Sequence, residues 1–230
     1  MAAAQARLWL FDIDGTLVDT GGAGMRALQQ ATAECYGGEG PPLDLAGSTD
    51  LGVLAGILAH FDLAHAEGEA ERFFAIYLAH LERNLAAGTW HGRVLPGAAG
   101  LLDELSRRSD ITIGLLTGNI AGGAGAKMRH YGLDHHFPFG AYGCDHADRN
   151  LLGPVALDRA AAHAGMTFTA QETLVIGDTP KDIACAHAMG ARCLAVATGK
   201  FSAEQLRAAG ADRVVQTLED PQILLEFVAE

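Results

Sequence analysis

Five short apolar runs recur along the chain, and most of them end in a polar turn that contains glycine. The runs show no alternation of polar and apolar residues, which is typical of central strands covered on both faces of a sheet. Stretches with the apolar spacing of helices separate them. This alternation predicts an α/β fold with a doubly wound parallel sheet. The runs are residues 8–11, 111–116, 173–176, 193–196 and 213–215, and the helical stretches are 98–108, 155–164, 181–189 and 203–209.

One long segment, residues 18–90, interrupts this alternation. It contains no convincing central strand, but three of its stretches have the apolar spacing of helices. Those stretches are residues 25–36, 51–60 and 67–85. We therefore expect two parts: an α/β core formed by residues 1–17 and 91–230, and an inserted α-helical cap domain formed by residues 18–90.

The overall charge and the cysteine pattern exclude several classes of protein. A formal net charge of -12 argues against a nucleic-acid partner, because the phosphates of nucleic acids bind basic surfaces. The four cysteines lack zinc-binding spacing, and no stretch approaches the roughly 18 apolar residues that span a membrane. The N-terminus does not have the pattern of a signal peptide. We expect a cytoplasmic protein with reduced, mostly buried thiols and no membrane partner, while the oligomeric state stays open.

Two carboxylates follow the first apolar run, in the segment Asp12-Ile13-Asp14-Gly15-Thr16. In a turn at the end of a strand, Asp12 and Asp14 lie two positions apart and can face one site. One can act as a nucleophile while the other acts as a general acid and base, provided that their environments differ. The alternative is an ordinary Asp-Gly turn at the end of a strand.

A second pair of carboxylates, Asp178 and Asp182, follows the third apolar run and flanks the start of a predicted helix. Carboxylate oxygens are ligands that magnesium prefers, so Asp178 could bind Mg²⁺ directly and Asp182 through water. The alternative is that Asp178 or Thr179 only caps the helix, with Pro180 at its first position.

The turn after the second run, Thr117-Gly118-Asn119, offers a hydroxyl and backbone N–H groups that can hold phosphate oxygens. Taken alone, this segment is more typical of a routine turn. The three turns follow parallel strands, so the fold would bring them to one edge of the sheet. Four carboxylates at that edge, with no basic residue beside Asp12 and Asp14, imply a metal ion.

These segments resemble the motifs of the haloacid dehalogenase-like hydrolase superfamily, and the chain is closest to its phosphoglycolate phosphatase-like branch with a helical cap. Residues 12–20 match the first motif of that family, residues 115–119 the second and residues 175–183 the fourth, in the right order. The resemblance implies a Rossmann-like core, a cap inserted after the first strand, Mg²⁺ as cofactor and hydrolysis of phosphate esters.

The resemblance also implies a role for each carboxylate. Asp12 would attack phosphorus and form an aspartyl-phosphate. Asp14 would protonate the leaving alcohol and later activate water. Mg²⁺ would be held by an oxygen of Asp12, the main-chain carbonyl of Asp14 and Asp178, with Asp182 in support through water. Thr117, together with Gly118 and Asn119, would bind the phosphoryl oxygens.

The third motif of the family usually offers a lysine that balances the nucleophile and the phosphate, but residues 145–150 contain none. Arg149 is the candidate replacement, because a guanidinium can pair with a carboxylate or a phosphate. The alternative is that Arg149 is a surface residue that pairs with Asp148 or Asp145.

Lys127, which follows the second motif, is a further candidate for binding the phosphate or the substrate. The interpretation that we favour for it is a solvated helix face, shared with Arg129 and His130.

These signals together predict a Mg²⁺-dependent phosphatase that acts on a small phosphorylated metabolite. The resemblance suggests phosphoglycolate as one such substrate. Two alternatives remain: a phosphomutase, which would share these motifs, and a non-catalytic binding or regulatory protein on the same scaffold.

The cap would supply contacts to the leaving group and close over the substrate to exclude water. Residues 47–50, Arg26, Arg72 and Arg83 are the candidates for such contacts. Each arginine could equally lie on a solvated helix face.

Overall fold

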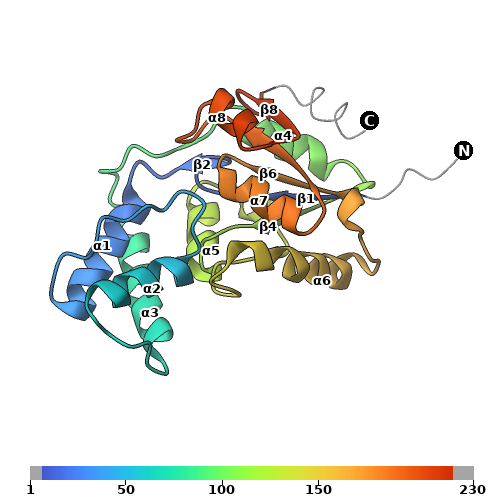
Figure 1. The fold of residues 1–230 in the computed structure, drawn as a ribbon. Coiled ribbons are helices and arrows are strands. Elements are labelled where there is room, and N and C mark those ends of the chain that lie inside the picture. Colours follow the sequence, from blue (N-terminus) through green and yellow to red (C-terminus); the bar gives the residue numbers. More distant parts are fainter. Residues whose placement is uncertain (1–6, 220–230) are drawn as a thin grey trace, which may run out of the picture.

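The computed structural model describes residues 7–219, in which six parallel strands form one sheet (Figure 1). In spatial order they are β5 (Gly140–Ala141), β4 (Ile111–Leu116), β1 (Arg7–Phe11), β6 (Thr173–Gly177), β7 (Arg192–Val196) and β8 (Arg213–Val215). The first strand pairs with β4 on one side and with β6 on the other. The direction of winding reverses at this point, as in doubly wound sheets, and the predicted fold class is confirmed.

Helices cover both faces of the sheet. One face carries α4 (Ala98–Ser106) and α5 (Ala121–His130), and the other carries α6 (Leu152–Ala164), α7 (Pro180–Ala188) and α8 (Ala203–Ala208). Successive side chains of β1 point to opposite faces of the sheet. Trp9 and Phe11 pack against the face that carries α4 and α5, and Leu8 and Leu10 pack against the other face. All four side chains are fully buried, and burial of each stabilises the fold by about 1.5–3 kcal/mol.

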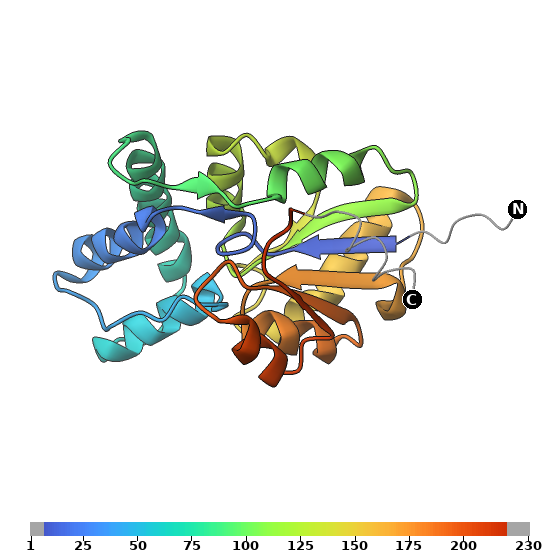
Figure 2. The same ribbon diagram turned by 90° about the horizontal axis from the view of Figure 1, so that it is seen from above.

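Three helices, α1 (Ala23–Tyr36), α2 (Asp50–His60) and α3 (Glu69–Ala86), form a cap-like region beside the sheet (Figures 1 and 2). They have an apolar core of their own, to which Leu54, Ile57, Phe73 and Leu81 contribute fully buried side chains. The chain leaves and re-enters the core through two antiparallel strands, β2 (Val18–Asp19) and β3 (Arg93–Val94).

The predicted helices and strands end within three residues of the observed ones, but no boundaries were predicted for α5 or for the shortest elements. Each of β2, β3 and β5 has two residues, which is too short to show a hydrophobic period. The single-turn 3₁₀ helices η1 (Asp134–His136), η2 (Arg149–Leu151) and η3 (Ala170–Glu172) are equally short.

In Figure 2, β1 and β6 point toward the cap-like region, and the parallel pairing gives the other strands of the sheet the same direction. The turns that follow β1, β4 and β6 therefore lie between the sheet and the cap helices. Among residues 7–219, no helix combines the length and the hydropathy that crossing a bilayer requires. Two of the four cysteines, Cys185 and Cys193, are buried, whereas Cys144 is exposed, so the expectation of mostly buried thiols holds only for half of them.

Candidate active site

A cavity of about 450 Å³ lies where the strand ends meet the cap helices. Side chains from all three predicted turns line it, together with cap residues on the opposite wall. Its charged lining residues include Asp12, Asp14, Asp50, Lys127, Arg149 and Asp178. A larger cavity of about 630 Å³ lies on the other side of residues 47–49, but neither Asp12 nor Asp178 lines it.

Asp12 directly follows the central strand β1 and is buried, with 4% of its surface exposed. Its backbone N–H donates to the carbonyl of Ile176, which fixes the turn to the neighbouring strand. Its carboxylate lies 3.1 Å from Arg149 Nη2 and accepts a hydrogen bond from the Thr117 hydroxyl. Burial raises the pKa of Asp12 to about 6; the Arg149 charge opposes this rise and nearby carboxylates add to it.

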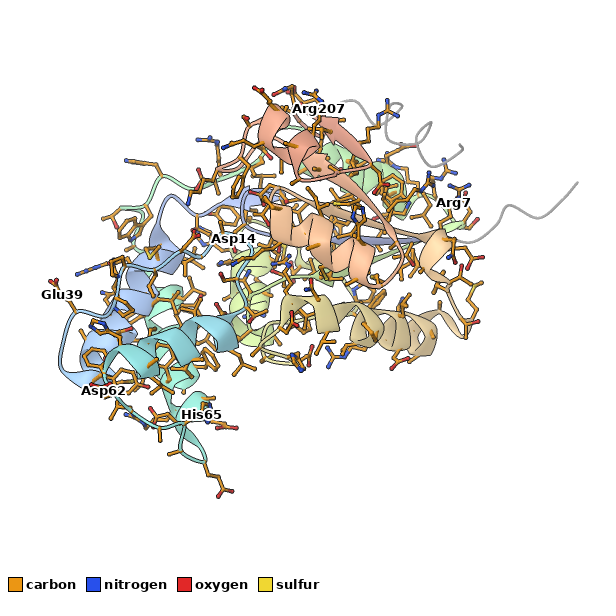
Figure 3. All side chains as sticks on the ribbon, viewed as in Figure 1. Arg7, Asp14, Glu39, Asp62, His65 and Arg207 are labelled. Atoms are coloured by element: carbon orange, nitrogen blue, oxygen red, sulfur yellow. The ribbon has the colours of Figure 1, made fainter. Side chains whose placement is uncertain are left out.

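Asp14 lies at the junction of cap and core (Figure 3) and is held by two donors on one oxygen. Lys127 Nζ donates to Asp14 Oδ2 over 2.6 Å, and Asn119 Nδ2 donates to the same atom over 2.8 Å. Lys127 also donates to Asn119 Oδ1 over 2.6 Å, so the three side chains form a closed set of hydrogen bonds. Asp14 is thereby fixed in orientation while 43% of its side chain remains exposed.

The prediction that Lys127 lies on a solvated helix face is wrong. Only 4% of this residue is exposed, because α5 packs this face against the turns that follow β1 and β4 and against the cap. The apolar spacing of α5 gave no sign of this burial: its residues around Lys127 are mostly glycine and alanine, which carry little periodic signal.

Asp178 follows β6 and is also buried, with 3% of its surface exposed. Thr16 Oγ1 donates to its carboxylate over 3.3 Å. Burial raises the pKa of Asp178 to about 9, and the charges of Asp182, Asp12 and Asp14 raise it further. Burial and the neighbouring negative charges therefore both disfavour the ionised form of Asp178.

Asp182 has two structural partners. Thr179 caps α7, as the helix-cap alternative predicted, and Asp182 completes a capping box by accepting from the backbone N–H and the hydroxyl of Thr179. The other oxygen of Asp182 accepts a hydrogen bond from Arg149. Asp178 takes no part in capping α7, and it lines the cavity.

The donor set fits a hard divalent cation. Carboxylate oxygens of Asp12, Asp178 and Asp182 lie within 4.8 Å of one another, and all three residues are buried. Oxygen-only ligands of this kind suit Mg²⁺, and a dication would relieve the repulsion that raises the pKa of Asp178. The side chain of Asp14 does not belong to this group.

Arg149 is buried in the centre of the site rather than at the surface. Its Nη2 donates to Asp182 and to the Leu116 carbonyl, and its Nη1 donates to the Gly47 carbonyl of the cap segment. Asp12 and Asp182 raise the pKa of Arg149 against the effect of burial. The alternative, a surface pair of Arg149 with Asp145 or Asp148, is not observed. Asp145 instead forms an ion pair with Arg159, at 2.6 Å.

The turn after β4 is bound to the cap by close contacts. A Cβ on Gly118 would lie 1.9 Å from the carbonyl oxygen of Ser48, so no larger residue fits here without a shift. The Thr117 hydroxyl also accepts from the backbone N–H of Asn119, over 3.3 Å. Thr117 is fully buried beside Asp12, whereas Gly118 and Asn119 line the cavity.

Asp50 is a charged residue of the site that the sequence did not single out from residues 47–50. Its carboxylate accepts from the Ile120 N–H over 2.7 Å, and its own N–H donates to the Gly118 carbonyl over 2.7 Å. Burial raises the pKa of Asp50 to about 6. Thr49, which caps α2, was the available sequence signal, since it places the next residue in the first turn of a helix.

The three arginines of the cap do not reach the cavity. Arg26, Arg72 and Arg83 are all exposed, and none of them lines it. Arg72 pairs with Glu69 over 2.7 Å on the helix surface. For these arginines the solvated-face alternative is the observed one.

Comparison with known proteins shows the family of this chain and the structures that share its fold. The sequence pattern of haloacid dehalogenase-like hydrolases matches residues 9–196. A phosphoglycolate phosphatase from Rhodospirillum rubrum is 30% identical over 212 residues, which cover 88% of this chain and 83% of that protein. Among solved structures, a hydrolase from Pseudomonas syringae has 23% identity and a TM-score of 0.72, covering 97% of this chain and 100% of that one. CbbY from Rhodobacter sphaeroides in complex with xylulose-(1,5)-bisphosphate has 20% identity and a TM-score of 0.73, covering 94% and 96%.

Proposed function

The chain belongs to the haloacid dehalogenase-like hydrolase family and is one of its phosphatases, and on that basis we propose that it hydrolyses a small phosphate monoester with Mg²⁺ through an aspartyl-phosphate on Asp12. The observation that carries this proposal is the setting of Asp12. This residue directly follows the central strand and lines the cavity, and its carboxylate lies beside the Arg149 guanidinium and the Thr117 hydroxyl. Phosphoglycolate is a candidate ester because the relative that is 30% identical is a phosphoglycolate phosphatase.

In the first step, a carboxylate oxygen of Asp12 forms a bond to phosphorus while the bond from phosphorus to the leaving oxygen breaks. Asp14 gives that oxygen a proton, so an alcohol departs. Lys127 and Asn119 hold the Asp14 carboxylate in the orientation that this transfer needs. In the second step, a water oxygen attacks phosphorus, Asp14 takes the proton of the water, and Asp12 leaves as a carboxylate with release of inorganic phosphate.

The remaining residues stabilise charge. Arg149, as the replacement for the family lysine, balances Asp12 and the charge that develops on the phosphoryl oxygens. Asp12, Asp178 and the Asp14 carbonyl would hold Mg²⁺, with Asp182 in support. When bound, the ion supplies positive charge to the transferring oxygens and to the carboxylates around them. The Thr117 hydroxyl and the N–H groups of Gly118 and Asn119 would bind phosphoryl oxygens.

The cap domain in this proposal consists of residues 18–90, and it would close over the substrate to keep bulk water out. The contacts of Gly47 with Arg149 and of Asp50 with Gly118 support this, because they join the cap segment to the catalytic turns.

Release of inorganic phosphate from a panel of small phosphate esters tests the proposal. We expect release that requires Mg²⁺, falls at least about 100-fold with EDTA and returns when Mg²⁺ is added in excess. A phosphomutase would instead convert a sugar phosphate into an isomer with little free phosphate. Release that EDTA leaves unchanged, or no release from any ester by folded protein, would contradict the proposal.

A further inference from the structure

The cap wall of the cavity offers apolar groups and carboxylates but no positive charge. Met25, Leu28, Val53 and Tyr77 supply its apolar surface. Residues 18–90 contain no lysine, and their three arginines are exposed outside the cavity. A leaving group that extends from the phosphate toward the cap therefore meets no cation of the cap.

The lysines and the arginine that line the cavity already have carboxylate partners. Arg149 pairs with Asp12 and Asp182, and Lys127 pairs with Asp14. These partners belong to the phosphate and metal end of the site.

Lys200, the remaining lysine of the lining, pairs with Asp44 over 3.3 Å at the exposed rim. Gly199 places it on the core side, since a Cβ there would touch Asp178. The backbone before Lys200 thus lies beside the metal end of the site, while its ammonium reaches out to Asp44 at the exposed rim.

The cap contributes two carboxylates to the lining: that of Asp19, whose side chain is 46% exposed, and the buried one of Asp50. Asp50 is only 7% exposed and lines the cavity, and one of its oxygens accepts from the Ile120 N–H. Burial and the charge of Asp50 raise the pKa of the Tyr77 phenol, so this hydroxyl stays protonated and can donate a hydrogen bond. Asp50 can accept from an alcohol but would repel a second anion on the substrate.

We propose that the substrate is the phosphate ester of a small alcohol with no second acidic group, and that Asp50 determines this preference. The inference rests on the proposed function, because it concerns the leaving-group end of the same site. A carboxylate or second phosphate on the leaving group would lose its water beside a buried carboxylate, with no free cation in the lining to replace that water. Phosphoglycolate and sugar bisphosphates are therefore poor substrates.

Two esters that differ in one group test this inference. Phosphoglycolate carries a carboxylate where 2-hydroxyethyl phosphate carries a hydroxymethyl group, so the pair isolates the charge. We expect kcat/KM for 2-hydroxyethyl phosphate to exceed that for phosphoglycolate by about tenfold or more, since like charges in contact discriminate strongly. Equal values, or a preference for phosphoglycolate, would overturn the inference.

The variant Asp50→Asn tests whether Asp50 causes this substrate preference. The amide oxygen can still accept from the Ile120 N–H, while the negative charge is lost. We expect the ratio of the two kcat/KM values to move toward one by about tenfold. Asp62→Asn, at the exposed far end of the cap (Figure 3), should leave the ratio unchanged. An unchanged ratio in folded Asp50→Asn would remove Asp50 from the proposal.

The failure of this inference can be told apart from the failure of the proposed function. The wild-type ratio tests the substrate class even if Asp50→Asn does not fold. A preference for phosphoglycolate that Lys200→Met abolishes would show that Lys200 binds the second anion, and the inference would be wrong. Loss of turnover with both esters and also with p-nitrophenyl phosphate would instead overturn the proposed function.

Discussion

Replacing Asp12 by asparagine is expected to lower kcat for phosphate release by roughly four orders of magnitude or more, because the attacking oxygen is lost. The amide keeps the shape of the side chain and can still accept from the Thr117 hydroxyl. Initial rates of phosphate release with saturating ester and Mg²⁺ measure the effect. The matched control is Asp158→Asn on the exposed side of α6, which should keep wild-type activity.

Loss of activity in Asp12→Asn is not expected to come from unfolding, because Arg149 keeps Asp182 as a partner. Burial raises the pKa of Asp12 to about 6, which means that the folded protein disfavours its ionised form at neutral pH. A neutral amide removes that penalty, so the Tm of metal-free Asp12→Asn should equal or exceed that of the wild type. Activity within tenfold of wild type in folded Asp12→Asn would show that Asp12 is not the nucleophile.

Replacing Arg149 by methionine is expected to affect both stability and catalysis. It leaves Asp12 and Asp182 buried without their cation, and breaking a buried ion pair from one side destabilises a protein by about 3–5 kcal/mol. Loss of charge stabilisation at the phosphoryl group should lower kcat by about 10²–10³-fold. Denaturant unfolding and phosphate release measure the two effects.

Arg149→Lys keeps the charge but loses the second nitrogen that reaches the Gly47 carbonyl. It should recover part of the lost activity, because the lysine still places one cation beside Asp12. The control is Arg108→Met, which removes a partly exposed pair with Asp110 and should change the free energy of unfolding by about 1 kcal/mol or less. Wild-type kcat in Arg149→Met would show that another residue supplies the charge.

The central architecture could be predicted because the sequence pattern and the packing agree. The runs that form β1, β4 and β6 are mostly apolar and do not alternate with polar residues, since both faces of each strand are covered by helices. The polar turns at their ends then meet at one edge as a consequence of parallel pairing. For this reason Asp12, Asp14, Thr117 and Asp178 could be placed together from the sequence.

The parts that escaped prediction depend on contacts between distant segments. Lys127 is buried because α5 lies under the cap, and nothing in its own neighbourhood of glycine and alanine indicates this. Asp50 lies in a helix whose periodicity describes its packing but not its link to Ile120. The edge strand β5 has two residues and forms only where β4 offers a free edge. Burial of polar side chains is set by tertiary packing, which hydrophobic periodicity does not record.

Trapping the phosphorylated enzyme tests the central claim, that Asp12 takes the phosphoryl group. Asp14→Asn should slow hydrolysis of the intermediate because the base for water is lost, while p-nitrophenyl phosphate needs little acid assistance to release its phenolate. The protein is mixed with this ester and Mg²⁺, quenched in acid and digested, and the phosphorylated peptide is sequenced by mass spectrometry. We expect a phosphoryl group on Asp12 that is absent with EDTA. Release of p-nitrophenolate without any phosphorylated protein, or phosphorylation of another residue, would contradict the account.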